Sequence, residues 1–294
     1  SGVSENKLCL GTVQLGMEYG INNALSRQPT EEESFAILQT AIDEGIACFD
    51  TASAYGSAEE ILGRFAIKNF PVNVISKLRA NVRPEGASIV AEIQMSLNRL
   101  GLTKLYGYML HRAEDFYLPG MLHGLQLAKE KGLIERIGVS VYEPQDALAA
   151  VKAPAVDMIQ IPYNVLDQRL DQTDFFALAR KNQVEVFARS AFLQGLLLME
   201  PERIPPKVAA ARPHVERFQE VIAPYGFTPL EAALLYSYSH SGISYVVFGA
   251  DTARQIKDNV KLVEKKEAFA ECYQALQGKF SDVPRKIVVP SLWG

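Results

Sequence analysis

The sequence predicts an α/β protein folded as a (β/α)8 barrel. Short apolar runs with β-branched or aromatic residues alternate with longer segments whose apolar residues recur at helical spacing. Eight such pairs fit within roughly 250 residues, the usual length of this barrel. A doubly wound sheet is the alternative. It is disfavoured because "GTVQLG", which follows the first run, lacks the G-x-G-x-x-G spacing of a dinucleotide-binding loop.

The expected strands are short apolar runs, and several of them end in a polar residue. They cover residues 8–11, 47–50, 72–77, 105–111, 136–140, 158–161, 185–189 and 245–248. Each is followed by a segment long enough to form a helix and return to the start of the next strand. This alternation favours parallel strands joined by helical crossovers.

The expected helices show helical periodicity or a capping signal. They lie near residues 31–44, 57–66, 84–100, 119–131, 144–151, 172–181, 229–239 and 252–263. In the segment 84–100, four apolar residues fall on one helix face; these are Ile89, Ile93, Leu97 and Leu100. Thr30 precedes three glutamates, as expected for a helix N-cap with acidic residues in the first turn.

The whole chain, residues 1–294, is expected to form a single barrel domain with two additions. Residues 190–228 contain five prolines and are predicted to form a long loop with an inserted helix. Residues 264–294 are predicted to form a C-terminal tail, with a helix near 267–280 and an extended end. Both segments are long enough to cover one mouth of the barrel.

Composition and charge narrow the class of protein. The net charge of −4 argues against a general nucleic-acid-binding protein, which normally has a basic face. No apolar run reaches the roughly 18 residues of a membrane span, and no secretory leader is visible. Three widely spaced cysteines fit neither a zinc site nor a disulfide framework, so reduced thiols and a cytoplasmic location are expected.

Polar residues at the ends of successive strands form the candidate active site. Asp50, Lys77 and His111 end the second, third and fourth strands, and Tyr55 follows in the loop after the second. Taken singly, each has an ordinary structural role, such as a helix cap, an ion pair or a turn. The carboxyl ends of barrel strands meet at one mouth, however, so all four are expected to converge there.

The chemistry of these four side chains suits carbonyl reduction. Hydride delivered to a carbonyl carbon leaves a developing alkoxide, which needs a proton and a positive field. Tyr55 could supply the proton if the ammonium of Lys77 lowers the phenol pKa from about 10. Asp50 would hold the lysine charged and in place. His111 could bind the substrate oxygen or relay the proton.

The four residues and their spacing resemble the Asp-Tyr-Lys-His tetrad of the aldo-keto reductases. Asp50-x₄-Tyr55-Gly56, Lys77 in "ISKL" and His111 in "MLHR" match its order, and "LGTVQLG" resembles the first-strand signature. The likeness extends from about residue 7 to residue 263. It implies a (β/α)8 barrel without a metal, with a nicotinamide cofactor extended across the mouth.

The resemblance also implies which residues hold the nicotinamide. Ser140 in "GVSVY" and Gln160 in "IQIPYN" would bind its carboxamide, with Asn164 supporting them, although Gln160 could instead be a buried polar residue. Family members often have asparagine at the position of Val141. Where many have an aromatic ring stacked on the nicotinamide, this chain has Arg189, whose planar guanidinium can also stack.

The segment "FGADTARQIKDN" resembles the family's adenosine-phosphate segment, in which a loop enters a helix N-terminus. By this resemblance Gly249, Arg254, Gln255 and Asn259 are cofactor-binding residues. The arginine that often binds the 2′-phosphate is replaced by Gln255, with Arg254 adjacent. We expect NADPH on family grounds, with NADH as the alternative.

These features predict an NAD(P)H-dependent oxidoreductase that reduces an aldehyde, a ketone or a sugar-type carbonyl, with Tyr55 as proton donor. Tyr19, Trp293 and residues 190–206 are candidates for the pocket wall, and "LGTVQLGMEYGINN" also resembles a bacterial branch of the family linked to carbohydrate biosynthesis. Two alternatives remain: a cofactor-binding sensor with little turnover, and a sugar epimerase. The expected partner is a small-molecule carbonyl compound, with neither nucleic acid nor membrane.

Overall fold

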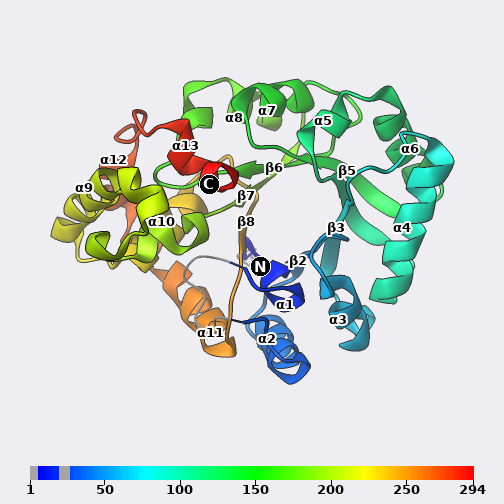
Figure 1. The fold of residues 1–294 in the computed structure, drawn as a ribbon, viewed down its shortest axis with the longest axis horizontal. Helices are drawn as coiled ribbons and strands as arrows, with labels where there is room; N and C mark the ends of the chain where they lie inside the picture. The colour runs from blue at the N-terminus through cyan, green and yellow to red at the C-terminus, as the bar shows by residue number, and fades with distance from the viewer. Residues whose placement is uncertain (1–5, 20–26) are drawn as a thin grey trace.

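Eight parallel strands close into a barrel in the computed structural model, which describes residues 6–19 and 27–294 (Figure 1). Each strand pairs with its neighbours in sequence, and β1 also pairs with β8. The strands are β1 (Leu8–Gly11), β2 (Cys48–Asp50), β3 (Asn73–Leu78), β4 (Leu105–Leu110), β5 (Ile134–Ser140), β6 (Met158–Pro162), β7 (Glu185–Arg189) and β8 (Tyr245–Phe248). The predicted fold class is confirmed.

The helices that follow the strands surround the barrel (Figure 1). They are α2 (Glu31–Asp43), α3 (Ala58–Arg64), α4 (Gly86–Leu100), α6 (Pro119–Glu130), α7 (Pro144–Val151), α8 (Phe175–Lys181), α10 (Pro229–Ser239) and α11 (Ala253–Leu262). Thr30 forms a capping box with Glu33, and the four apolar residues predicted to share one face of α4 are buried. Within the described ranges, no helix is long and apolar enough to cross a membrane.

Two short helices at the mouth were not expected from the sequence. α1 (Val13–Gly16) follows β1 directly, and α5 (Ala113–Phe116) comes just after β4. Helices of four residues are too short to show an apolar period. β4 also ends at Leu110, so His111 stands one residue beyond the strand and not within it.

The predicted insertion and tail lie against one another. The insertion contains α9 (Arg212–Ile222), and the tail contains α12 (Ala270–Leu276), which packs on α9, and α13 (Arg285–Val288). The expectation of an extended chain end is wrong, since α13 is followed by a 3-10 turn at Pro290–Leu292. A closed barrel has no free strand edge to which an extended segment could add.

The interior of the barrel below the mouth is filled by side chains and is not a channel. A separate apolar cluster occupies it, comprising Cys9, Cys48, Ile75, Met109, Met158, Phe187 and Val247. Gly107 and Gly138 make room for Met158, because a Cβ on either would lie 2.6 Å from atoms of that side chain. Cysteines 9, 48 and 272 are all buried and free. The polar side chains that line the mouth therefore lie above this apolar cluster.

Candidate active site

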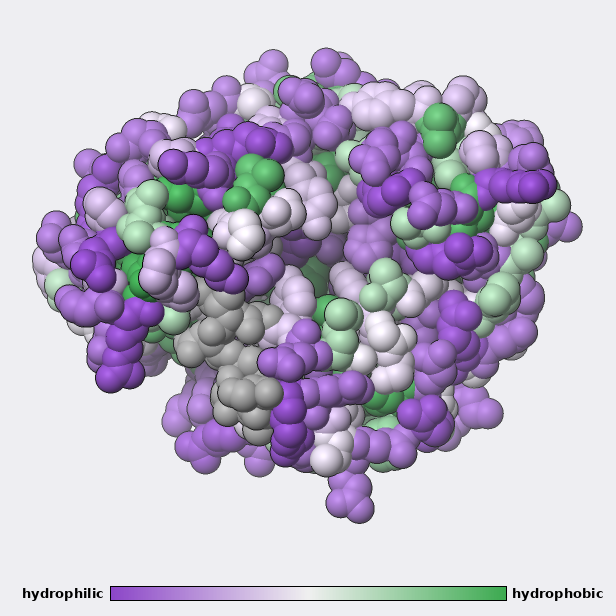
Figure 2. Space-filling model, viewed as in Figure 1, coloured by the Kyte–Doolittle hydropathy of each residue, from purple (hydrophilic) through white to green (hydrophobic). Residues whose placement is uncertain are grey.

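One pocket opens at the carboxyl ends of the strands, and Figure 2 shows this face hollowed near its centre. Its volume is about 530 Å³. Most of the predicted site residues line it: Asp50, Tyr55, His111, Ser140, Gln160, Arg189, Gly249, Gln255 and Asn259. Lys77 lies beneath the pocket floor, and Arg254 lies outside the wall.

Asp50 and Lys77 form a buried ion pair. The Lys77 Nζ lies 2.8 Å from both carboxylate oxygens of Asp50 and also donates to the Thr51 carbonyl at 3.1 Å. The lysine side chain is fully buried, and that of Asp50 is 3% exposed. Burial alone would lower the lysine pKa, but Asp50 and Tyr55 outweigh it and raise the pKa above its ordinary value. Lys77 is therefore a cation at neutral pH.

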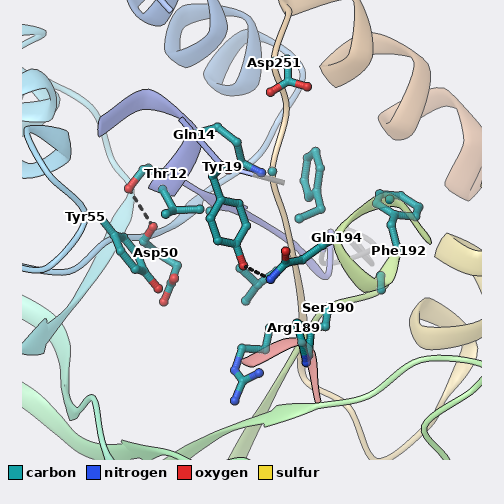
Figure 3. A pocket seen from close by; sticks show the side chains of 18 of the residues that line it. Thr12, Gln14, Tyr19, Asp50, Tyr55, Arg189, Ser190, Phe192, Gln194 and Asp251 are labelled. Carbon is teal, nitrogen blue, oxygen red and sulfur yellow. Dashed lines mark hydrogen bonds between the residues drawn. The ribbon is translucent and has the colours of Figure 1, made fainter. Parts of the chain in front are cut away.

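Tyr55 lines the pocket beside Asp50, as Figure 3 shows, and contacts the buried cation of Lys77. Its hydroxyl lies 3.2 Å from the Lys77 Nζ, and its ring packs edge-on against His111 at 5.6 Å. The expected lowering of the Tyr55 pKa is wrong in its net direction. Burial raises the pKa of the phenol by more than Lys77 lowers it. Tyr55 is consequently a neutral phenol at pH 7, able to donate a proton, with a cation in place to stabilise the phenolate.

His111 is held in its neutral form. Burial and the nearby charges of Lys77 and Arg189 lower its pKa from 6.5 to about 3. A neutral imidazole can donate one N–H to a substrate oxygen and keeps a lone pair on the other nitrogen. In the proposed role His111 would orient the carbonyl, while Tyr55 would supply the proton.

The low pKa of His111 predicts a pH-dependent stability. The unfolded chain takes up a proton below pH 6.5 and the folded chain does not, so stability falls as pH drops from 6.5 towards 3. At pH 4.5 this group alone is expected to cost about 2–3 kcal/mol. Urea unfolding at pH 7 and pH 4.5 should show a smaller acid loss for His111→Gln than for the unmodified chain. An equal loss of stability in both proteins would contradict this prediction.

The amide of Gln160 is tied to the same ion pair. Its Nε2 donates to the Asp50 Oδ1 at 3.0 Å, which leaves its Oε1 to accept a hydrogen bond from a ligand amide. Ser140 is the register partner of Gln160 on the neighbouring strand. Asn164 is fully buried and donates to the Ser190 carbonyl at 3.0 Å. It thereby supports Ser190, whose φ of 68° is rare for a residue with a side chain.

Arg189 lines the pocket at the same end as Tyr55 and His111, and in Figure 3 it lies below Asp50 and Tyr55. Its guanidinium lies 4.2 Å from the centre of the Tyr142 ring and donates to the Val141 carbonyl. Phe187, which lies two residues earlier on β7, belongs to the apolar cluster in the barrel interior. The planar group at this wall is therefore the guanidinium, braced by the exposed ring of Tyr142.

The far end of the pocket is built by β8 and α11. A Cβ on Gly249 would lie 1.9 Å from the Gln14 amide nitrogen, so glycine leaves room for this amide. The Gln14 Oε1 lines the pocket region, is buried, and has no hydrogen-bond partner among the described residues. A buried acceptor without a partner is costly unless a ligand or water satisfies it. This atom fits a pocket shaped to hold a polar cofactor.

Arg254 and Gln255 differ in their access to this end. Arg254 is 83% exposed and pairs with Asp258 at 3.1 Å, four residues along α11. Gln255 lines the pocket, and its Oε1 accepts from the Asp251 backbone N–H at 2.7 Å. Asp251 and Asp258 also line the pocket, so this end of it carries two carboxylates.

Several pocket residues were not singled out from the sequence. Thr12 donates to the Asp50 carbonyl at 3.0 Å, and Tyr19 receives a hydrogen bond from Gln194 at 3.3 Å across the pocket (Figure 3). The sequence predicts Tyr19 as a residue of the pocket wall, whereas Gln194 lies only within the predicted range 190–206. A lone glutamine in a loop carries no periodic signal. Gln194 and Leu193 have positive φ angles of 53° and 50°, and the sequence of this loop does not predict them.

The C-terminal tail reaches the pocket, but not through Trp293. Pro290 and Ser291 line the wall, while the indole is 6% exposed, packs in the main core and donates to the Ile287 carbonyl at 3.0 Å. Trp293 therefore packs in the core and does not form part of the pocket wall. It anchors the tail so that Ser291 stands at the rim.

A closed (β/α)8 barrel is typical of one class of oxidoreductases when its mouth carries a cluster such as Asp50, Tyr55, Lys77 and His111. The model of the Aldo/keto reductase family matches residues 7–278, so the chain belongs to that family. It is accordingly an NAD(P)H-dependent oxidoreductase.

Three proteins illustrate what this chain is similar to. The uncharacterized oxidoreductase YqkF of Bacillus subtilis (strain 168) is 26% identical over 91% of this chain and 94% of its own length. The NADH-specific methylglyoxal reductase of Escherichia coli (strain K12) is 25% identical over 88% and 90%. The holo form of aldo-keto reductase AKR11C1 from Bacillus halodurans superposes with a TM-score of 0.78 at 23% identity, covering 95% of this chain and 93% of that one.

Proposed function

We propose that this protein reduces the carbonyl of a small aldehyde, ketone or sugar-type substrate to an alcohol, with Tyr55 as the proton donor. One observation carries the proposal. The Lys77 ammonium lies within hydrogen-bond distance of both the Asp50 carboxylate and the Tyr55 hydroxyl. A phenol beside a buried cation, facing a pocket, is suited to protonate a developing alkoxide.

Substrate binding would use Tyr55 and His111 together. Both line the pocket and their rings are in contact, so two donors can converge on one carbonyl oxygen. Because His111 is neutral, it donates a hydrogen bond without competing for the proton. The two bonds polarise the carbonyl and fix its carbon towards the reducing group.

Proton transfer would pass from the Tyr55 hydroxyl to the substrate oxygen. The nicotinamide cofactor supplies the hydride when it is bound. The phenolate that remains on Tyr55 is stabilised by Lys77 at 3.2 Å. Asp50 and the Thr51 carbonyl hold the ammonium in place throughout, and Tyr55 then takes a proton back from solvent.

Two sets of residues would hold the cofactor. Ser140 and Gln160 stand beside the ion pair, where their polar atoms can bind a carboxamide, and Arg189 offers a planar face at the same end. Gln14, Gln255 and Asn259 line the other end, and 28 of the described residues contribute to one continuous pocket. The pocket thus spans from the reactive cluster to α11, as an extended dinucleotide requires.

The charges at the α11 end favour NADH over the NADPH expected from family resemblance. Among the described residues that line this end, none is lysine or arginine, and residues 1–5 and 20–26 contain neither. Asp258 is compensated by its ion pair with Arg254, but the carboxylate of Asp251 would repel a 2′-phosphate and can instead accept a hydrogen bond from a ribose hydroxyl. The NADH-specific reductase among the relatives is consistent with this choice.

Fluorescence titration of the purified protein with NADH and NADPH tests the cofactor proposal. NADH is expected to bind at least as tightly as NADPH. Gln255→Arg should improve NADPH affinity by about tenfold relative to NADH, because a guanidinium pairs well with a phosphate. Gln255→Met is the matched control, since it also loses the bond to Asp251 but adds no charge. Tight NADPH binding by the unmodified protein would restore the first expectation and assign Arg254 to the phosphate.

The substrate class is tested on the same preparation. Tyr19, Tyr142 and Phe192 line the mouth with aromatic rings, whose faces pack well on the C–H surfaces of sugars. NADH oxidation should therefore be followed with methylglyoxal, glyceraldehyde and a panel of aldoses. Cofactor binding without turnover of any carbonyl compound would favour the alternative of a sensor.

A further inference from the structure

A second buried ion pair lies behind the loop that carries Tyr55, outside the pocket. The Glu59 side chain is 2% exposed, and its Oε1 accepts from the Arg99 Nε at 2.9 Å. Its Oε2 accepts from the Ser76 hydroxyl at 2.7 Å. The pair joins α3, α4 and β3 where the helices approach closely, since a Cβ on Gly63 would lie 2.0 Å from the Arg99 carbonyl oxygen.

Arg99 reaches from this pair to the loop itself. Its NH2 donates to the Ser53 hydroxyl at 3.3 Å and to the Ser96 hydroxyl at 3.2 Å, and the two hydroxyls are 3.2 Å apart. The Ser53 N–H donates to the Lys77 carbonyl at 3.3 Å. The loop is therefore fastened to the backbone of Lys77 on one side and to Arg99 on the other.

Two serines bound to this ion pair lie just before Tyr55 and Lys77 in the sequence. Ser53 stands two residues before Tyr55, and Ser76 stands directly before Lys77. We propose that Glu59 and Arg99 are positioning residues that set the separation between the Tyr55 hydroxyl and the Lys77 ammonium. The inference rests on the proposed function, in which that separation controls the proton donor.

The physical reason lies in the distance dependence of the reaction. Small misplacements of a reacting group, of about 1 Å, can cost roughly 10²-fold in rate. Tyr55 is on a loop, and loops are less well fixed than the elements they join. A fork of donors on a partly buried arginine restricts the loop more firmly than a single hydroxyl contact, because the guanidinium is planar and makes several bonds at fixed angles.

Ser53→Ala and Ser96→Ala form a matched pair of variants. Both remove one hydroxyl bound to Arg99, but only Ser53 belongs to the loop that carries Tyr55. Ser53→Ala is expected to lower kcat by about tenfold with little change in KM or cofactor affinity. The alkaline limb of its pH profile should move to higher pH, because a phenol farther from Lys77 ionises less readily. Ser96→Ala should leave kcat and the alkaline limb of the pH profile nearly unchanged.

Arg99→Lys provides an independent check that does not remove a serine. It keeps a cation beside Glu59, so the fold is preserved, but a single ammonium cannot bind the carboxylate and both hydroxyls as the fork does. It should reproduce the Ser53→Ala shift with a smaller change in Tm than Arg99→Met. If Ser53→Ala and Ser96→Ala lower Tm alike and neither moves the pH profile, the pair has a purely structural role and the inference is wrong.

A titration without turnover separates this inference from the proposed function. The phenolate absorbance of Tyr55, obtained as the difference between the protein and Tyr55→Phe, should rise at higher pH in Ser53→Ala than in the unmodified chain. An unchanged titration overturns the positioning role even if the enzyme is active. A shifted titration in a protein that reduces no carbonyl would uphold the positioning role and reject the reductase.

Discussion

Tyr55→Phe is expected to lower kcat for carbonyl reduction by about 10²–10⁴-fold, the usual contribution of a general acid. The change removes the hydroxyl that lies 3.2 Å from the Lys77 Nζ and leaves the ring that packs on His111. Cofactor affinity should change little, because Ser140, Gln160 and the α11 end are untouched. Stopped-flow and steady-state rates with NADH, together with cofactor titration, would measure the two effects separately.

Tyr19→Phe is the matched control for this prediction. Tyr19 also presents a phenol to the pocket, but its hydroxyl accepts a hydrogen bond from the neutral amide of Gln194, whereas that of Tyr55 accepts one from Lys77. Its loss should alter KM by a few-fold at most and leave the pH profile in place. If Tyr55→Phe behaves in the same mild way, the proton comes from another group and His111 becomes the candidate donor.

The fold and the reactive cluster could be predicted because each depends on local patterns. Alternating apolar runs and amphipathic helices predict the barrel, and its geometry brings strand ends to one mouth. Asp50, Lys77 and His111 could be identified without knowing any contact between distant segments, because each lies at the end of a predicted strand. Even here, β3 ends at Leu78 and β4 ends before His111, so the strand bounds were right only to within a residue.

Features that depend on burial or on distant segments could not be predicted. The net direction of the Tyr55 pKa is set by desolvation, which the sequence does not reveal, and burial outweighs the effect of Lys77. The orphaned Gln14 amide depends on Gly249, more than 200 residues away in the chain. The sequence makes Trp293 a candidate for the pocket wall, but the helical turns of the tail place its indole in the core.

Lys77→Met is expected to lose both activity and stability. The variant leaves the Asp50 carboxylate buried with the Gln160 amide but without a cation, and removing one partner of a buried ion pair typically costs about 3–5 kcal/mol. It also removes the charge that stabilises the Tyr55 phenolate. The rate should fall by at least about 10²-fold, and the limb assigned to Tyr55 should move to higher pH because burial is then unopposed.

The double variant Asp50→Asn/Lys77→Met distinguishes the two losses. Neither side chain is charged in it, so most of the stability lost in Lys77→Met should return, while activity should not. Asp50→Asn alone isolates the role of the carboxylate. Without Asp50, burial lowers the Lys77 pKa. At alkaline pH the lysine beside the phenol is then a neutral amine, so the rate of carbonyl reduction should fall as the lysine loses its charge. Urea unfolding and rates measured on all four proteins complete the cycle. Recovery of activity together with stability in the double variant would mean that the ion pair only supports the fold and that Tyr55 acts without Lys77.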